Sequence, residues 1–214
     1  MAMAGLLSFG SQPRGLVNFI SDIRNVKSKD EERTRIDKEL GNIRLKFSSA
    51  STLTSYQKKK YVWKMCYIYM LGYEVDFGHS EFISIIGSQK YQEKAVGYMA
   101  VSMMIRPGDE LLTLVINSMR NDLCSNSNFS QSLSLSVVAN LGGGDLASAL
   151  GNDVERLLMD SEVGKYGYSA LSPETEARNR CFVRKKAALC LSQLFRSNPE
   201  NLDLDIWALS LIHI

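Results

Sequence analysis

Four lysines, Lys58, Lys59, Lys60 and Lys64, occupy a stretch of seven residues that leads into an apolar helix. A helix N-terminus already carries partial positive charge, so each cation placed there costs a few tenths to about 1 kcal/mol unless an anion is bound. Exposed backbone N–H groups together with lysines form a phosphate-binding site. The residue types and their spacing therefore predict a site for a phosphorylated ligand.

The distribution of charge along the chain supports an anionic partner. Residues 1–64 contain 13 Lys/Arg and 6 Asp/Glu, about +7, whereas residues 65–214 contain 12 and 17, about −5. A basic N-terminal third on an acidic body indicates binding to nucleic acid or to an anionic membrane surface. The 214 residues, 45% of them hydrophobic, are enough to bury a core.

Catalytic and metal chemistry have little support in the sequence. There is no CxxC motif, no nucleophile–base pair and no paired-carboxylate motif, so we expect no enzyme activity, no cofactor and no metal site. Two of the cysteines, Cys66 and Cys190, lie in apolar helical patterns and are expected to be core thiols. The residues considered for these roles are His79, His213, Cys66, Cys124, Cys181 and Cys190.

Targeting and membrane-spanning segments are not predicted. The start of the chain lacks a basic region followed by a long apolar one, so we expect no signal peptide. No run of 18 apolar residues occurs, and Lys64 interrupts the best candidate. We expect a cytoplasmic protein whose membrane contact is peripheral.

Apolar residues recur with helical spacing nearly everywhere, and no alternating strand pattern is present. Ser28 to Glu31 form a predicted capping box, Asp145 a predicted N-cap, and Gly142–Gly144 a predicted helix end and turn. The stripes are Leu16–Phe19–Ile20–Ile23, Ile36–Leu40–Ile43–Phe47, Val62–Met65–Cys66–Tyr69, Val96–Met99–Ala100–Met103, Leu112–Val115–Ile116–Met119, Leu133–Val137–Val138–Leu141, Leu146–Leu150–Val154–Leu157 and Val183–Ala187–Cys190–Leu194.

The helical stripes also repeat along the chain. Polar-to-apolar entries at Lys58, Lys94 and Gln131 are 36 and 37 residues apart, and the next, near Lys185, follows after about 54. The excess matches residues 161–179, which are rich in Ser, Gly, Glu and Tyr and are predicted to be an inserted loop. Two helices per unit at this period indicate a single all-α domain over residues 1–214, a HEAT- or armadillo-like α-solenoid.

Several segments closely resemble the N-terminal trunk of the alpha-adaptin family, the alpha-type large subunits of the plasma-membrane clathrin adaptor complex. The resemblance runs from about residue 14 to about residue 207, in register except at 161–179, and Phe-Ile-Ser-Asp-Ile-Arg-Asn at 19–25 favours the alpha type. The segments that carry it are residues 15–25, 37–44, 58–64, 71–79, 97–98, 117–122 and 183–191.

The resemblance implies a solenoid trunk that assembles with beta, mu and sigma subunits at the cytoplasmic face of the plasma membrane and reaches clathrin through the complex. Arg24 matches an arginine that helps to bind the acidic residue upstream of a dileucine cargo signal. Thr34 and Ser48 stand where lysines are expected, and Arg33 and Arg35 compensate only if they turn inward. A phosphatidylinositol bisphosphate site is implied at Tyr56, Lys58, Lys59, Lys60 and Lys64, with Lys46 as an outer contact.

Alternatives remain open from the residues alone. The chain could belong to another adaptor complex, or be an armadillo-type scaffold for nuclear transport or nucleic-acid binding. Tyr61, Trp63, Tyr67 and Tyr69 could stack on bases, although packing between helices is the expected role of such aromatics. We expect the fold to tolerate loss of the four lysines, because Lys60 and Lys64, four residues apart, are predicted to lie off the packed face of their helix. The apolar residues 205–214 end without a cap, which indicates a truncated chain.

Overall fold

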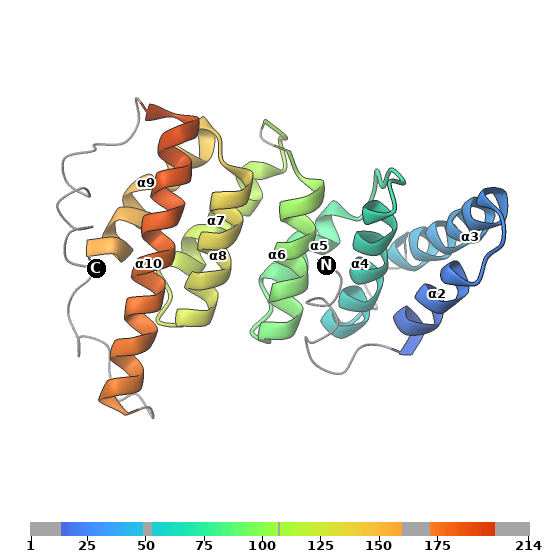
Figure 1. Ribbon diagram of the computed structural model, residues 1–214, viewed down its shortest axis with the longest axis horizontal. Coiled ribbons are helices and arrows are strands. Elements are labelled where there is room, and N and C mark those ends of the chain that lie inside the picture. The colour runs from blue at the N-terminus through green and yellow to red at the C-terminus, as the bar shows by residue number, and fades with distance from the viewer. Residues whose placement is uncertain (1–13, 49–52, 107, 160–171, 200–214) are drawn as a thin grey trace. The chain divides into compact units, whose positions relative to one another are not determined.

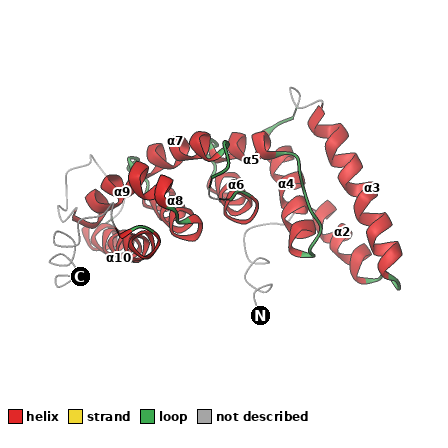
Figure 2. Cartoon of the chain, turned by 90° about the horizontal axis from the view of Figure 1, so that it is seen from above, coloured by secondary structure: helices red, strands yellow, loops and turns green. Residues whose placement is uncertain are grey.

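The computed structural model describes residues 14–48, 53–106, 108–159 and 172–199, and all regular secondary structure in these ranges is helical (Figures 1 and 2). The predicted all-α class is therefore confirmed for this part of the chain. The chain divides into two compact units, Met1–Met104 and Ile105–Ile214. A membrane-spanning helix is not found in the described ranges, because no helix there is both long and apolar enough.

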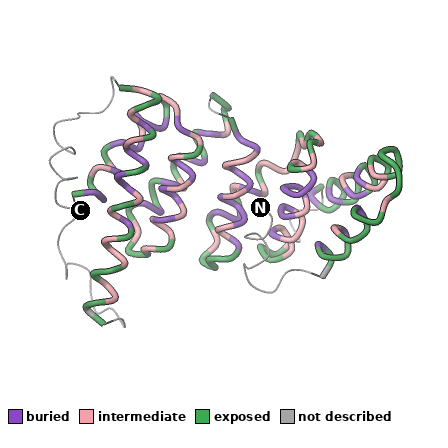
Figure 3. The backbone as a smooth tube through the Cα atoms, in the orientation of Figure 1, coloured by how far each residue is buried: buried purple, intermediate pink, exposed green. Residues whose placement is uncertain are grey.

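In the first unit, helix α4 (Ser55–Met70) is the central element. It packs against α2 (Arg14–Arg24), α3 (Lys29–Ser48), α5 (His79–Ile86) and α6 (Tyr91–Met104). The stripe predicted for this helix is only part of its packed surface, since Trp63, Tyr67 and Ile68 are buried beside Val62, Met65 and Cys66. A helix with neighbours on most sides is apolar around most of its circumference, which explains this pattern (Figure 3).

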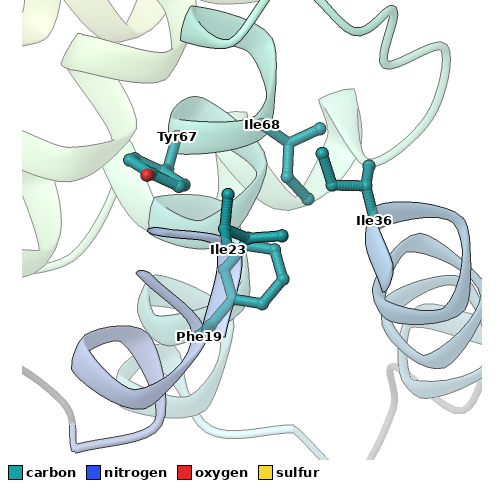
Figure 4. Packing of buried hydrophobic residues seen from close by; sticks show 5 residues of the cluster. All are labelled: Phe19, Ile23, Ile36, Tyr67 and Ile68. Carbon is teal, nitrogen blue, oxygen red and sulfur yellow. The ribbon is translucent and has the colours of Figure 1, made fainter. Parts of the chain in front are cut away.

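A compact hydrophobic cluster holds α2 and α3 against α4 (Figure 4). Phe19 and Ile23 of α2 and Ile36 of α3 meet Tyr67 and Ile68 of α4. The rings of Phe19 and Tyr67 lie edge to face with centroids 6.1 Å apart. Burial of each such side chain stabilises the fold by about 1.5–3 kcal/mol, so the cluster fixes the position of α2.

Two glycines of the first unit permit close packing. Gly97 of α6 faces α5, and a Cβ atom there would lie 2.9 Å from side-chain atoms of Ile85 and Ile86. Gly78, just before α5, has φ of +84°, and a Cβ would lie 2.7 Å from Met65 Cε. Both positions need a residue without a side chain, which gives a physical reason for two glycines in segments that carry the family resemblance.

The second unit contains α7 (Leu112–Leu123), α8 (Asn128–Leu141), α9 (Gly144–Met159) and α10 (Pro173–Ser197). Helix α10 packs on both α8 and α9, and α7 packs on the same two helices. Leu135, Leu150 and Leu191 are fully buried in this core. Most members of the apolar stripes predicted for residues 112–194 are buried in this core, but Ile116, Leu133 and Leu141 are half-buried.

The predicted repeat corresponds to alternate helices. Lys58, Lys94, Gln131 and Lys185 lie in α4, α6, α8 and α10, with one further helix between each pair. Within each unit these alternate helices also pack directly on each other, α4 on α6 and α8 on α10. The prediction of two helices per repeat is confirmed within each unit.

Three local predictions were wrong. Helix α5 was not predicted, because its eight residues are too short to display a stripe. Asp145 lies in the first turn of α9 and is not its N-cap, although Gly142 does end α8 as predicted.

Helix α10 begins at Pro173, so residues 173–179 are not a loop as predicted. Residues 160–171 lie outside the described part of the chain. Proline at the first helical position starts a helix, with Ser172 as the cap.

Candidate functional site

The predicted phosphate site begins at a well-capped helix start. Thr54 precedes α4 in extended conformation, and its hydroxyl accepts a hydrogen bond from the Gln57 backbone N–H at 3.4 Å. The Gln57 side chain accepts in return from the Thr54 backbone N–H at 2.9 Å. This reciprocal capping box fixes the first turn of α4, and with it the directions in which the following lysines leave the helix.

Tyr56, Lys58 and Lys60 form the solvent-facing part of the site, which we call the exposed group. The Tyr56 side chain is 49% exposed, and the Lys60 ammonium lies 5.7 Å from its ring centroid. Lys58 donates a hydrogen bond to the Ser84 hydroxyl of α5 at 3.0 Å. A hydroxyl on α5 and a tyrosine ring thus hold two partly exposed ammonium groups where an anion can reach them.

Lys59 has a different environment from the lysines on either side of it. It is only 4% exposed, because it shares a helix face with the buried Trp63, and its ammonium lies 5.1 Å from the Tyr56 ring centroid. Burial lowers the pKa of Lys59, and the nearby carboxylate of Glu93 on α6 opposes that shift. Lys59 therefore supports the position of Tyr56 from beneath.

Lys64 is engaged in an ion-pair network that joins α4 to α3 and α2. Its ammonium contacts the Glu39 carboxylate, and both side chains are largely buried, 15% and 10% exposed. Arg35 donates to the same carboxylate at 3.0 Å and to Asp22 of α2 at 3.1 Å. The expectation that Lys64 lies off the packed face is wrong, because the side of α4 that carries it is covered by α3.

The carboxylate at the centre of this network is stabilised in its ionised form. Burial of Glu39 opposes ionisation, but hydrogen bonds from Lys64 and Arg35 outweigh it and hold the pKa of the carboxyl below its usual value. The Phe19 ring lies beneath both cations, 5.5 Å from the Lys64 ammonium and 4.9 Å from the Arg35 guanidinium carbon. The network therefore stands on the hydrophobic cluster that anchors α2.

Helix α3 supplies the remaining predicted contacts. Lys46 is exposed in its last turn, next to Phe47, whose ring meets Tyr61 of α4 with centroids 6.0 Å apart. The Thr34 and Ser48 hydroxyls donate to carbonyls of their own helix. Arg33 is exposed, whereas Arg35 is held by two carboxylates. Arg35 therefore does not compensate for the missing lysines.

Arg24 lies apart from the lysines. It is exposed in the last turn of α2, and it has no ion-pair partner in the described part of the chain. The hydrophobic cluster holds this helix against α4 (Figure 4). The structure thus places Arg24 on a packed helix, with its side chain exposed.

Sequence reasoning missed the acidic members of the site, Asp22 and Glu39, and the hydroxyl of Ser84. A signal for Glu39 was present, because a carboxylate three residues after Ile36 and four before Ile43 falls on an apolar stripe. A charge on such a stripe is buried and needs a partner. The sequence offers no comparable signal for Asp22 or Ser84.

Several of the other residues considered for chemistry have packing roles, whereas Cys124 is exposed and Cys181 is half-buried. Cys66 and Cys190 are confirmed as core thiols, and burial raises the pKa of each to about 12. The packing role expected of Trp63 and Tyr67 is confirmed, since each is 6% exposed. His79 packs on Phe82 with ring centroids 5.5 Å apart. No group of three metal-ligating side chains occurs in the described ranges, and His213 lies outside them.

Comparison with known proteins identifies relatives of the chain. The family profile described as Adaptin N terminal region matches residues 32–210. The chain is 49% identical to the AP-2 complex subunit alpha-1 of Arabidopsis thaliana over 195 residues, which are 91% of the chain and 18% of that protein.

Two relatives from one organism separate the subunit types. Identity to the AP-2 complex subunit alpha of Schizosaccharomyces pombe is 42% over 87% of the chain, and to its AP-1 complex subunit gamma-1 it is 30% over 86%. The chain spans 18–19% of the length of these relatives.

Proposed function

Because the chain belongs to the adaptin N-terminal family, we propose that it acts as the N-terminal trunk of an alpha-type large subunit in a clathrin adaptor complex for endocytosis. The predicted resemblance to the alpha type is confirmed, since identity is 42% to the alpha subunit and 30% to the gamma subunit of the same yeast. The role is a non-catalytic one in vesicle-mediated protein transport, on the cytoplasmic face of the plasma membrane at clathrin-coated pits. Its partners are beta, mu and sigma subunits, with clathrin reached through the assembled complex.

Within that role, the start of α4 binds a phosphoinositide headgroup. The observation that carries this proposal is the exposed group at a capped helix start, in which half-buried Lys60 lies at the ring of half-exposed Tyr56 and half-buried Lys58 is bonded only to the Ser84 hydroxyl within the described ranges. Lys58 and Lys60 contact the phosphates, and Lys46 acts as an outer contact. Lys59 and Lys64 belong to the same site but act from beneath, by positioning Tyr56 and by joining α4 to α3.

The test compares liposomes of equal total charge that contain either phosphatidylinositol bisphosphate or phosphatidylserine. A compact cation group favours one dense, multivalent phosphate over a diffuse surface field, so we expect stronger retention on the phosphoinositide liposomes. Equal retention would reduce the site to a nonspecific basic patch. A steep dependence of binding on salt, with broad phosphate tolerance, would instead favour nucleic acid.

A second part of the proposed function is recognition of dileucine-type cargo signals through Arg24. Its exposed guanidinium on the anchored helix α2 supports this role. In the assembled complex, Arg24→Ser should weaken binding of a peptide with an acidic residue upstream of the two leucines by about 1.5–3 kcal/mol, the contribution of a charge-assisted hydrogen bond. Membrane recruitment should be unchanged, and an unaltered peptide affinity would disprove the role.

A further inference from the structure

A lysine without a carboxylate partner in the described ranges, Lys186, lies on α10, which packs beside α8 in the second unit (Figure 1). The Lys186 ammonium of α10 donates to the Ser132 carbonyl at 3.2 Å and to the Ser136 hydroxyl at 2.8 Å, both on α8. Within the described ranges it forms no ion pair with a carboxylate. Burial lowers the pKa of Lys186, and no acidic neighbour offsets this shift.

Two polar groups between α8 and α10, the Lys186 ammonium and the Ser132 hydroxyl, do not make all the hydrogen bonds they can. An ammonium group has three N–H donors, of which two are occupied here. The hydroxyl of Ser132, a residue only 8% exposed, has no hydrogen-bond partner. A buried polar group without a partner is costly, and natural structures contain few of them. The Ser132 hydroxyl is itself buried, so the group that an external acceptor can reach is the third N–H of Lys186, which is half-buried.

Exposed apolar side chains flank the cation. Phe182 and Leu189 are 54% and 71% exposed, and they lie four residues before and three residues after Lys186 on one stripe of α10. Phe129 on α8, the helix to which Lys186 is bonded, is 69% exposed. The Lys186 ammonium stands 5.3 Å from the Phe182 ring centroid. Exposed aromatic groups around one cation are typical of protein interaction surfaces.

We propose that the stripe Phe182–Lys186–Leu189, together with Phe129 of α8, binds a protein segment that presents one carboxylate between two apolar side chains. The seven-residue separation of Phe182 and Leu189 corresponds to about 10 Å along a helix. A partner helix with apolar residues at i and i+7 and Asp or Glu at i+4 matches this spacing. The proposal is independent of the lipid and cargo sites of the first unit.

A protein partner fits this surface better than an anionic membrane. The Lys186 ammonium is held in place by two hydrogen bonds, a geometry that suits one carboxylate. Residues 105–214 contain 10 Lys/Arg and 13 Asp/Glu, about −3, so the field of this unit repels an anionic surface.

The test uses the full chain and a designed helical probe peptide that carries a fluorophore, with Leu at i and i+7 and Glu at i+4. A matched peptide carries Gln in place of Glu. We expect the Glu peptide to bind at least tenfold more tightly, a difference that corresponds to 1.4 kcal/mol. Lys186→Gln should abolish this difference, whereas Lys185→Gln, at the exposed neighbouring position, should preserve it. Phe182→Ala should weaken both peptides to the same extent.

A second neutral variant, Lys186→Met, removes the charge with a different side chain. The helical circular dichroism of every variant is compared with that of the unmodified chain, which separates loss of charge from loss of fold. Absence of peptide binding, equal affinity for both peptides, or an equal effect of Lys185→Gln would overturn the proposal. Sedimentation with phosphatidylserine vesicles that depends on Phe182 and Lys186 would assign the stripe to a membrane. A dimer of the chain that Lys186→Gln dissociates would assign it to a second copy.

Discussion

Two pairs of lysines on helix α4 have opposite surroundings. Lys58 and Lys60, the exposed pair, are half-buried, and among the described residues their contacts are a hydroxyl and a tyrosine ring. Lys59 and Lys64, the packed pair, are enclosed by α6 and α3 and lie near carboxylates. All four belong to one run in the sequence, so the role of each cation is set by which neighbouring helix covers its side of α4.

The largest expected difference between the pairs concerns stability. In Lys64→Gln, the carboxylate of Glu39 loses one of its two cations while it stays buried. Breaking a buried ion pair costs 3–5 kcal/mol when no partner remains; because Arg35 remains, we expect a loss of about 2 kcal/mol. That loss lowers Tm by about 4–8 °C in thermal unfolding followed by circular dichroism.

The matched control is Lys60→Gln, which removes the same charge one helical turn earlier. This side chain has no carboxylate partner in the described ranges, so its replacement should change the free energy of unfolding by less than about 0.5 kcal/mol. Equal Tm values for the two variants would contradict the distinction between the pairs.

A smaller effect is expected from pH. Since the pKa of Glu39 is below its usual value of 4.5, the folded state binds this proton less readily than the unfolded state. The stabilisation is therefore complete above about pH 4.5 and is lost as the pH falls through the lower, folded-state pKa. Urea unfolding between pH 7 and pH 3 should show this loss in the unmodified chain. Glu39→Gln should lack that part of the pH dependence, and identical profiles would refute the role of Glu39.

The smallest effect is expected at Lys46. It is exposed in the last turn of α3, where a cation interacts favourably with the helix dipole, so Lys46→Gln should destabilise the protein by about 0.3 kcal/mol. As an outer contact it should also reduce partitioning onto phosphoinositide liposomes by less than either residue of the exposed pair. A larger loss of binding than that of Lys60→Gln would place the headgroup nearer the end of α3.

The helices and their repeat could be predicted from the sequence, because apolar stripes such as Val183–Ala187–Cys190–Leu194 depend only on local periodicity. The division of the lysines could not. Burial of Lys59 depends on α6, which begins 32 residues later, and pairing of Lys64 depends on Glu39, 25 residues earlier. Contacts of that range are set by how helices pack, and the pattern of one helix does not contain them.

The role of Arg35 also could not be predicted from the sequence, because it depends on contacts with other helices. By sequence it could replace a missing lysine at position 34, since the two are adjacent. In the structure it donates to Asp22 and Glu39 and so ties α2 to α3. The sequence shows that residue 35 carries a positive charge. Its role is decided by its two carboxylate partners, which lie on α2 and α3.

The most direct test of the account compares two double variants in two assays. Lys58→Gln/Lys60→Gln should lower partitioning onto phosphatidylinositol bisphosphate liposomes by about 2 kcal/mol, roughly 30-fold, with unchanged Tm. Lys59→Gln/Lys64→Gln should lower Tm by several degrees, and where the chain remains folded it should keep more of the liposome binding. If both double variants lose liposome binding equally and keep the Tm of the unmodified chain, the four lysines are equivalent surface cations, and the division of α4 into an exposed and a packed pair is wrong.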